Sequence, residues 1–238
     1  MLLFFIRHGD PIYKPDSLTP LGERQAEAVA KRLALYGVDR IFASTSERAR
    51  CTALPTGELL KQEITLLDWC NENHAWKQLT VVNQEGRRLW GFQHPETADF
   101  FNSPELRAMG KNWYEHPRFE GTTFKEGFCR IGRETDAFLS ELGYTHDTEK
   151  CLYHAEKPTE ERIALFAHQG FGLAFLSWVL DIPYPVFCTH FDMGHTGMSV
   201  IEFASRDGIC VPKMLTLAND SHLYREGLPT NYQNRLRF

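Results

Sequence analysis

Two segments of the chain are almost entirely apolar, without the polar alternation expected of a strand that faces water on one side. They are Leu2–Ile6 and Ile163–Ala167. Such runs are typical of strands buried on both faces of a parallel sheet. Residues 40–43 resemble a third strand of this kind. Less regular apolar runs predict further strands over residues 64–69, 151–154, 198–203 and 211–217.

Helical periodicity follows two of these strands. Thr19 and Pro20 suit the N-cap and first position of a helix, and apolar residues then recur at helical spacing until Gly37. A helix that is apolar nearly all round follows His168. The order of strands and helices at both ends of the chain is therefore that of an α/β protein.

Capping boxes predict the start of two further helices. Ser44 with Glu47 predicts one, which Pro55 is expected to kink or split. Thr123 with Glu126 predicts another, which ends at a glycine in position 143. These helices complete a three-layer α/β sandwich, in which helices flank a mainly parallel central sheet.

The sequence predicts a single domain, residues 1–238, that carries an inserted cap at about residues 73–121. Residues 73–121 lack clear periodicity, yet four of the five tryptophans lie in this stretch or beside it: Trp69, Trp76, Trp90 and Trp113. A solvated linker would not carry so many aromatic side chains, so we expect the segment to fold. Trp76, Trp90, Phe92 and Trp113 either line a substrate pocket or form a small core of the cap, and core packing is the expected use of most of them.

Composition narrows the class of protein. With 42% apolar and 24% charged residues the chain is not a disordered tail, and a net charge of −5 disfavours nucleic acid as a partner. The six cysteines form no C-x-x-C pair, which favours reduced thiols and a cytoplasmic location. The N-terminal apolar run lacks a basic leader, and the run over residues 171–180 is too short to span a bilayer, so no membrane partner is expected.

The two buried strands end alike, in a histidine that a turn glycine follows. The segments are Arg7-His8-Gly9 and His168-Gln169-Gly170. Ligands of open α/β sheets bind at the carboxyl ends of the strands. Arg48, in the first turn of the second helix, belongs to the same edge. Two arginines and two histidines suit a phosphoryl group, because each guanidinium group can donate hydrogen bonds to two phosphoryl oxygens at once.

These motifs resemble those of the histidine phosphatase superfamily, also called the phosphoglycerate mutase-like family. They occur in the family's order: Arg7-His8-Gly9, then Leu18-Thr19-Pro20-Leu21-Gly22, then Ser44 through Arg48-Ala49 to Thr52-Ala53, and finally His168. The resemblance covers most of the chain. It implies that His8 is the nucleophile that accepts the phosphoryl group, and that Arg7, Arg48 and His168 hold the phosphate. We expect Gly9, Gln169 and His195 to bind the phosphate as well.

The resemblance also implies a glutamate as proton donor, and Glu72 lies at the matching place. An alkoxide leaving group needs a proton, and aromatic neighbours favour the neutral form of a carboxyl group. Asp10, Glu85 and Asp192 are the alternatives. The spacing of His190, Asp192 and His195 differs from that of a helical zinc site, so we expect no metal and no cofactor.

The predicted function is therefore phosphomonoester hydrolysis through a phosphohistidine, by an enzyme of the histidine acid phosphatase type. The substrate would be a small phosphorylated metabolite. A phosphoglycerate mutase is one alternative, although residues 10–13 depart from the signature of the mutases. A catalytically inactive phosphate-binding module is the other. The sequence leaves the physiological substrate and the oligomeric state open.

Overall fold

A six-stranded mixed sheet forms the centre of the protein, in a computed structural model that describes residues 1–232. The strand order is β14-β11-β1-β10-β4-β5. Four neighbours, β1, β10, β4 and β5, pair in parallel, and β11 is antiparallel to β1 and β14. The predicted α/β fold with a mainly parallel sheet is thus confirmed. The bounds are β1 Leu2–Arg7, β4 Arg40–Ser44, β5 Ile64–Leu67, β10 Arg162–Ala167, β11 Met198–Glu202 and β14 Lys213–Asn219.

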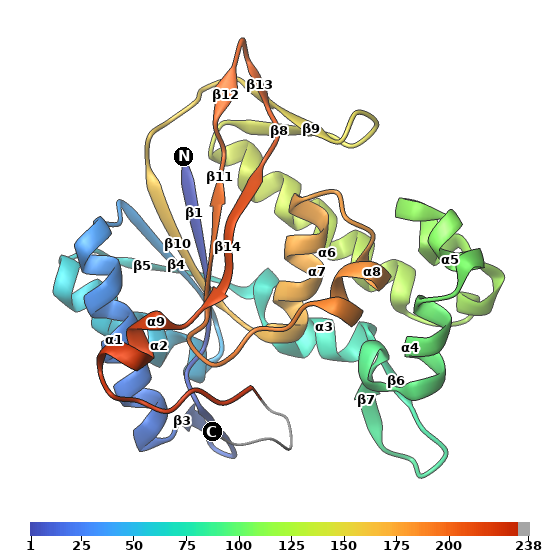
Figure 1. The fold of residues 1–238 in the computed structure, drawn as a ribbon, viewed down its shortest axis with the longest axis horizontal. Coiled ribbons are helices and arrows are strands. Elements are labelled where there is room, and N and C mark those ends of the chain that lie inside the picture. Colours follow the sequence, from blue (N-terminus) through green and yellow to red (C-terminus); the bar gives the residue numbers. More distant parts are fainter. Residues whose placement is uncertain (233–238) are drawn as a thin grey trace.

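Helices cover both faces of this sheet (Figure 1). One face carries α1 (Pro20–Tyr36), α2 (Glu47–Leu60) and α9 (Ser221–Arg225), and the other carries α3 (Glu72–Gln78), α6 (Phe124–Glu141), α7 (Gln169–Val179) and α8 (Tyr184–His190). Strand β1 contributes to two cores in alternation. Phe4 and Ile6 join the core under α1, whereas Leu3 and Phe5 join the core under α7. Burial on both faces explains why the strand is apolar throughout.

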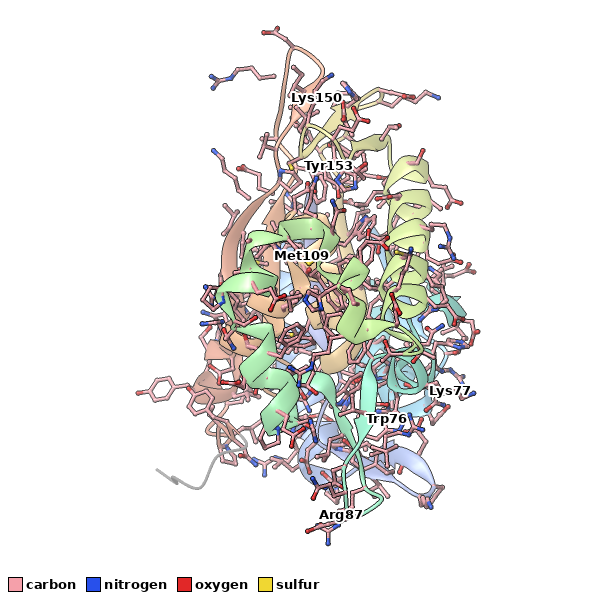
Figure 2. The ribbon with its side chains drawn as sticks, turned by 90° about the vertical axis from the view of Figure 1, so that its right-hand side faces the viewer. Trp76, Lys77, Arg87, Met109, Lys150 and Tyr153 are labelled. Atoms are coloured by element: carbon pink, nitrogen blue, oxygen red, sulfur yellow. The ribbon has the colours of Figure 1, made fainter. Side chains whose placement is uncertain are left out.

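We propose that residues 73–121 form an inserted cap. This segment begins within α3 and continues in short elements (Figure 2). Trp113 is fully buried and its ring contacts those of Phe101, Phe128 and Tyr184. The segment therefore shares the core of α6 and α8. Its elements are β6 Thr80–Val82, β7 Arg88–Trp90, η2 Gly91–Gln93, α4 Pro95–Phe101, α5 Pro104–Ala108, η3 Gly110–Glu115 and η4 Pro117–Phe119, and η1 Asp68–Cys70 precedes α3.

Two smaller sheets complete the fold. A four-stranded sheet of order β12-β13-β9-β8 lies beyond the ends of β1 and α6 (Figure 1). A hairpin of β2 (Pro11–Tyr13) and β3 (Asp16–Leu18) links β1 to α1. The remaining bounds are β8 Tyr144–Asp147, β9 Leu152–Ala155, β12 Ser205–Arg206 and β13 Ile209–Cys210. Among residues 1–232 no helix has the length and apolar character needed to cross a membrane.

The predicted capping box at Ser44 is wrong. Helix α2 begins at Glu47, and the side chain of Ser46 is its cap, accepting a hydrogen bond from the amide of Ala49 at 3.4 Å. Ser44 ends strand β4 instead, and its hydroxyl lies 2.8 Å from Nε2 of His168. A serine at the end of a buried strand is thus used by the tertiary structure rather than by the helix that follows it.

Two further local predictions need correction. The Thr123 hydroxyl does not cap α6, because it donates a hydrogen bond to the Gln78 carbonyl at 2.8 Å. Pro55 does not split α2, which continues from Glu47 to Leu60. The carbonyl that Pro55 leaves without a helical donor belongs to Cys51, which is only half-buried and so can bind water. The helix around Thr19 begins and ends as predicted.

Candidate active site

The two strand-end histidines lie side by side. Strands β1 and β10 are adjacent and parallel, with Arg7 opposite Ala167, so both strands release their next residue at the same edge. The ring centroids of His8 and His168 are 5.2 Å apart, and both side chains are buried. The register of two neighbouring strands therefore creates the pair of histidines.

The hydrogen bond of His8 identifies its tautomer. Nδ1 lies 2.7 Å from the carbonyl oxygen of Gly9, which can only accept, so Nδ1 carries the proton. Nε2 is then unprotonated. Desolvation, the adjacent His168 and the positive charge of Arg7 hold the pKa of His8 well below its ordinary value. At neutral pH His8 consequently presents a nitrogen lone pair, which is what a nucleophile requires.

Two guanidinium groups flank this histidine. The Nη atoms of Arg7 donate to the carbonyl of Met193 at 2.6 Å and to Nε2 of His195 at 3.1 Å, whereas Arg48 donates to Asp16 at 2.8 Å. The Nε atoms of both arginines are buried and have no partner among the described residues. A buried donor without a partner is costly, so both groups are suited to an anion.

Glu72 is held at the N-terminus of α7. Its two carboxylate oxygens accept hydrogen bonds from the amides of Gly170 and Phe171, each at 2.9 Å. Burial raises the pKa of Glu72, and these amide donors oppose that rise. The carboxyl group has a defined position and an increased tendency to keep its proton. It also occupies amides of α7 that could otherwise bind a phosphate.

His168 is fixed from the other side. Its Nε2 lies 2.8 Å from the hydroxyl of Ser44 and 3.2 Å from that of Ser46, while Nδ1 is buried without a partner among the described residues. Desolvation, followed by the charges of Arg48 and Arg7, holds the pKa of His168 well below its ordinary value. A neutral His168 has one ring nitrogen free for a ligand.

These groups meet at a pocket of about 410 Å³. Five of the eight predicted site residues line it, namely Arg7, His8, Arg48, Glu72 and Gln169. Gly9, His168 and His195 lie outside the lining. The pocket is also lined by five residues that sequence analysis did not assign to the site: Tyr13, Asp16, Asn73, Trp76 and Trp90.

Gly9 and His195 have contacts other than those expected of phosphate ligands. The amide of Gly9 donates to the Thr52 hydroxyl at 2.9 Å, and a Cβ on this glycine would lie 2.7 Å from the carbonyl oxygen of Gly22. Close packing thus requires the glycine. Nε2 of His195 accepts from Arg7, and burial lowers the pKa of His195 to about 4. His195 is a neutral acceptor that orients Arg7.

The three alternative acids lie outside the pocket lining. Asp10 accepts from the Thr19 hydroxyl at 2.7 Å, Asp192 from the side chain of Gln169, and Glu85 pairs with Arg87 in the turn between β6 and β7. His190 contacts the carbonyl of Val186 at 3.0 Å. Within residues 1–232 no group of three or more His, Cys, Asp or Glu side chains is arranged to hold a metal ion.

The β2–β3 hairpin brings an acid to Arg48 that sequence reasoning missed. The Asp16 carboxylate accepts from the guanidinium of Arg48 at 2.8 Å and from the amide of Glu47 at 2.9 Å. The ring of Tyr13 lies 5.5 Å from the same guanidinium. No local signal marks either residue, because the hairpin acquires its role only by folding over the start of α2.

The chain matches a family model described as the histidine phosphatase superfamily, branch 1, over residues 3–213. No curated protein matches it. A solved structure of phosphoserine phosphatase from Entamoeba histolytica is similar at 18% identity and a TM-score of 0.59, with 93% of this chain and 98% of that chain covered.

Two more solved structures share the fold. The mycobacterial glucosyl-3-phosphoglycerate phosphatase is 19% identical, with a TM-score of 0.58 and coverage of 91% of this chain and 98% of that chain. The alpha-ribazole phosphatase from Shigella flexneri is 20% identical, with a TM-score of 0.58 and coverage of 92% and 97%, respectively. Because the family model spans nearly the whole sequence, the chain belongs to the histidine phosphatase superfamily, branch 1.

Proposed function

We propose that this protein hydrolyses phosphomonoesters through a phosphohistidine on His8, as an enzyme of the histidine acid phosphatase type. The observation that carries the proposal is the unprotonated Nε2 of His8, fixed by the hydrogen bond from Nδ1 to the Gly9 carbonyl. It lies in a pocket with two guanidinium groups and a carboxyl group of raised pKa. Nucleophile, phosphate ligands and acid are thus within one pocket.

The first step transfers the phosphoryl group to the protein. Nε2 of His8 forms a bond to phosphorus while the bond to the leaving oxygen breaks. Protonated Glu72 gives its proton to that oxygen, so an alcohol leaves and Glu72 becomes a carboxylate. Arg7 and Arg48 bind the phosphoryl oxygens, whose charge they compensate in the transition state.

The second step reverses these roles with water as the nucleophile. The Glu72 carboxylate takes a proton from water, whose oxygen attacks phosphorus as the bond to Nε2 breaks. Inorganic phosphate leaves, and His8 and Glu72 return to their starting protonation states. In this scheme Nε2 of His168 accepts from the Ser44 hydroxyl, so the protonated Nδ1 donates to a phosphoryl oxygen. His195 and Gln169 position their neighbours. The chemistry uses no metal and no cofactor.

A trapping experiment tests the proposal. After brief mixing with a labelled phosphomonoester and an alkaline quench, which preserves phosphoramidates, we expect label on the peptide that contains Arg7-His8-Gly9. His8→Ala should abolish both label and turnover, whereas His190→Ala, which changes an exposed histidine, should affect neither. Label on a different residue, or turnover by His8→Ala near the unsubstituted rate, would contradict it.

Two controls separate the alternatives. With 3-phosphoglycerate, a hydrolase releases inorganic phosphate, whereas a mutase equilibrates it with 2-phosphoglycerate. A binding module would bind phosphate and turn nothing over.

Activity is expected to persist in chelator, since two arginines supply the positive charge that a divalent ion would bring. Loss in chelator with recovery on adding zinc or magnesium would overturn that expectation.

The substrate class and location are proposals as well. The solved structures of relatives include complexes with phosphoserine and 3-phosphoglyceric acid, which favours a small phosphorylated substrate here. All six cysteines are free. Reduced thiols are typical of a reducing compartment, which supports a cytoplasmic protein.

A further inference from the structure

One side of the pocket is aromatic. Trp76 lies on α3 four residues after Glu72, so the two side chains occupy the same face of the helix, one turn apart. The ring of Trp76 meets that of Trp90 edge to face, with centroids 5.0 Å apart. Phe92 stacks on Trp90 at 5.9 Å. The two tryptophans thus form a supported wall.

The wall of Trp76 and Trp90 packs against the helix that positions Glu72. A Cβ on Gly170 would lie 2.2 Å from the ring of Trp90, so this ring packs directly on the first turn of α7. The same turn holds the carboxylate of Glu72. Acid and wall therefore share one rigid support, and their relative positions depend on packed elements rather than on a loop.

The reaction places the leaving group at this wall. Glu72 must reach the leaving oxygen to protonate it, and side chains one helical turn apart lie about 5–6 Å from each other. The atoms that follow the leaving oxygen therefore meet Trp76. Tyr13, which is 67% exposed, lines the same pocket from the hairpin. Aromatic faces attract flat rings by stacking, beyond the gain from burying apolar area.

The charges of the pocket select against an acidic leaving group. Of the ten lining residues, the permanent cations are Arg7 and Arg48, which the proposed mechanism assigns to the phosphate. Of the two acidic side chains in the lining, Asp16 is paired with Arg48, and Glu72 carries its proton when the ester binds. A carboxylate on the leaving group would therefore find no free cation in the lining to offset its loss of hydration.

We propose that the preferred substrates are phosphomonoesters whose leaving group is a flat aromatic ring without a carboxylate, seated on Trp76, which the nearly buried Trp90 supports. The inference rests on the proposed function and names the substrate class of that site. It distinguishes the chain from the Entamoeba histolytica phosphatase, whose solved complexes hold phosphoserine and 3-phosphoglyceric acid, both carboxylated.

Benzyl phosphate and cyclohexylmethyl phosphate test the aromatic wall, because both release a primary alcohol of similar size. We expect kcat/KM to favour benzyl phosphate by roughly 3- to 10-fold. Trp76→Leu should remove this preference and Trp76→Phe should restore it in part. Phe191→Leu, which changes an exposed ring outside the pocket lining, should keep it. Equal kcat/KM values for the two esters in the unsubstituted protein would overturn the aromatic part.

Phosphotyramine and phosphotyrosine test the charge argument, because they share a leaving phenol and differ by one carboxylate. We expect phosphotyramine to be favoured at least roughly tenfold in kcat/KM. Asn73→Lys adds a cation to the lining and should reduce the ratio of kcat/KM for phosphotyramine to kcat/KM for phosphotyrosine. Asn73→Gln should leave this ratio unchanged. A preference for phosphotyrosine would refute the charge argument.

The outcomes keep the two proposals apart. If none of the four esters is hydrolysed and His8 takes no label, the proposed function fails. If all four are hydrolysed with equal kcat/KM within each pair and His8 is labelled, the proposed function stands and this inference fails.

Discussion

A neutral, desolvated imidazole next to a carboxyl group of raised pKa determines how activity should depend on pH. The pKa of His8 is held well below its ordinary value by burial and neighbouring positive charge, and that of Glu72 is raised by burial. At the residue scale, the proposed nucleophile is thus kept free and the proposed acid protonated over a common range of pH.

The first prediction is a bell-shaped pH profile of kcat/KM. Activity should fall at acid pH as His8 gains a proton, and this limb should lie below the ordinary histidine pKa of about 6.5. It should fall again at higher pH as Glu72 ionises, above the ordinary glutamate value. An acid limb centred above about pH 7 would assign the nucleophile to a different group.

The second prediction concerns the leaving group. Glu72→Gln cannot donate a proton, so turnover of an alkyl phosphate should fall about 10²- to 10⁴-fold, whereas an activated aryl phosphate should lose far less. The substitution also exchanges an acceptor of the Gly170 and Phe171 amides for an NH₂ group. That loss affects both substrates equally, so the ratio of their rates isolates the acid. An equal loss on both would move the role to another carboxyl group.

At the scale of elements, the start of α1 and the end of β1 are joined by the close approach of two backbones. A Cβ on Gly22 would lie 2.2 Å from the carbonyl oxygen of Asp10, and a Cβ on Gly9 would meet Gly22. The loop that carries His8 therefore depends on two glycines that face each other. Their role is close packing.

The third prediction follows from that contact. Alanine is favoured over glycine inside a helix by up to about 1 kcal/mol, yet Gly22→Ala should destabilise the protein by about 1–3 kcal/mol because the backbone of Asp10 must move. Glu27→Ala, on the exposed face of the same helix, should be neutral within about 0.5 kcal/mol. Urea unfolding of both variants measures the difference. A higher unfolding free energy for Gly22→Ala would show that the backbone at Asp10 moves at little cost.

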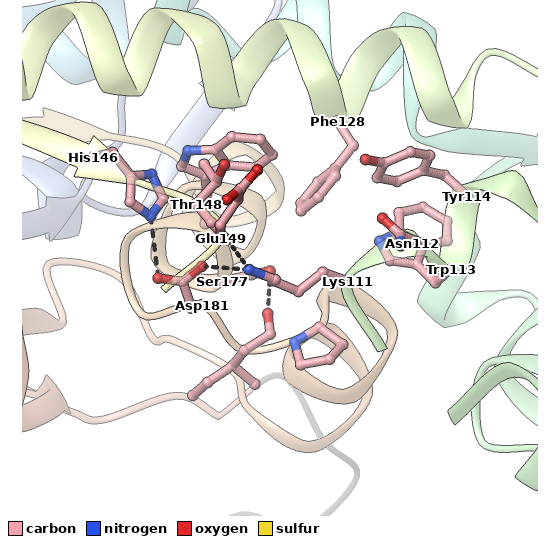
Figure 3. A pocket seen from close by; sticks show the side chains of 13 residues that line it. Lys111, Asn112, Trp113, Tyr114, Phe128, His146, Thr148, Glu149, Ser177 and Asp181 are labelled. Atoms are coloured by element: carbon pink, nitrogen blue, oxygen red, sulfur yellow. Dashed lines mark hydrogen bonds and ion pairs between the residues drawn. The ribbon is translucent and has the colours of Figure 1, made fainter. Parts of the chain in front are cut away.

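At the scale of the whole molecule, a chain of charges joins distant elements (Figure 3). His146 on β8 lies 2.9 Å from Asp136 on α6 and 3.1 Å from Asp181 after α7. Asp181 also faces Lys111 of η3 at 3.6 Å. The small sheet, two long helices and the proposed cap therefore meet in one ionic network, beside a second pocket of about 490 Å³.

The fourth prediction is a pH dependence of stability from this network. The hydrogen bonds and charges of Asp136 and Asp181 outweigh desolvation and raise the pKa of His146 to about 9, above the ordinary value of 6.5. Its contribution, on the order of 2–3 kcal/mol, should be complete below about pH 6.5 and be lost as pH rises through about 9. Urea unfolding from about pH 6 to about pH 10 measures it.

His146→Gln provides the control for that series. It should lower the unfolding free energy most at the acid end, where the imidazolium is charged, and progressively less toward alkaline pH. A difference between the two proteins that stays constant across the series would show that His146 is not charged in the folded state.

Much of the fold could be predicted because the relevant signals are local. Burial on both faces makes β1 and β10 continuously apolar, and Thr19 caps α1 by accepting a hydrogen bond from the amide of Gly22. Parallel strands end at a common edge, so the pattern of strands is enough to place His8 and His168 together. These features need only a few neighbouring residues to be recognised.

The tertiary structure alone decided how the side chains are used. Ser44 serves His168 rather than a helix, Gly9 packs against Gly22, and Asp16 reaches Arg48 from a hairpin. Trp90 joins the pocket wall because β7 packs on the start of α7, whereas Trp76 lies one helical turn from Glu72 on α3. Hydrogen bonds and ring contacts between residues distant along the chain depend on register and packing, which no local pattern records. The sequence by itself therefore determined the sheet and the candidate chemistry, whereas the shape and charge of the pocket required the fold.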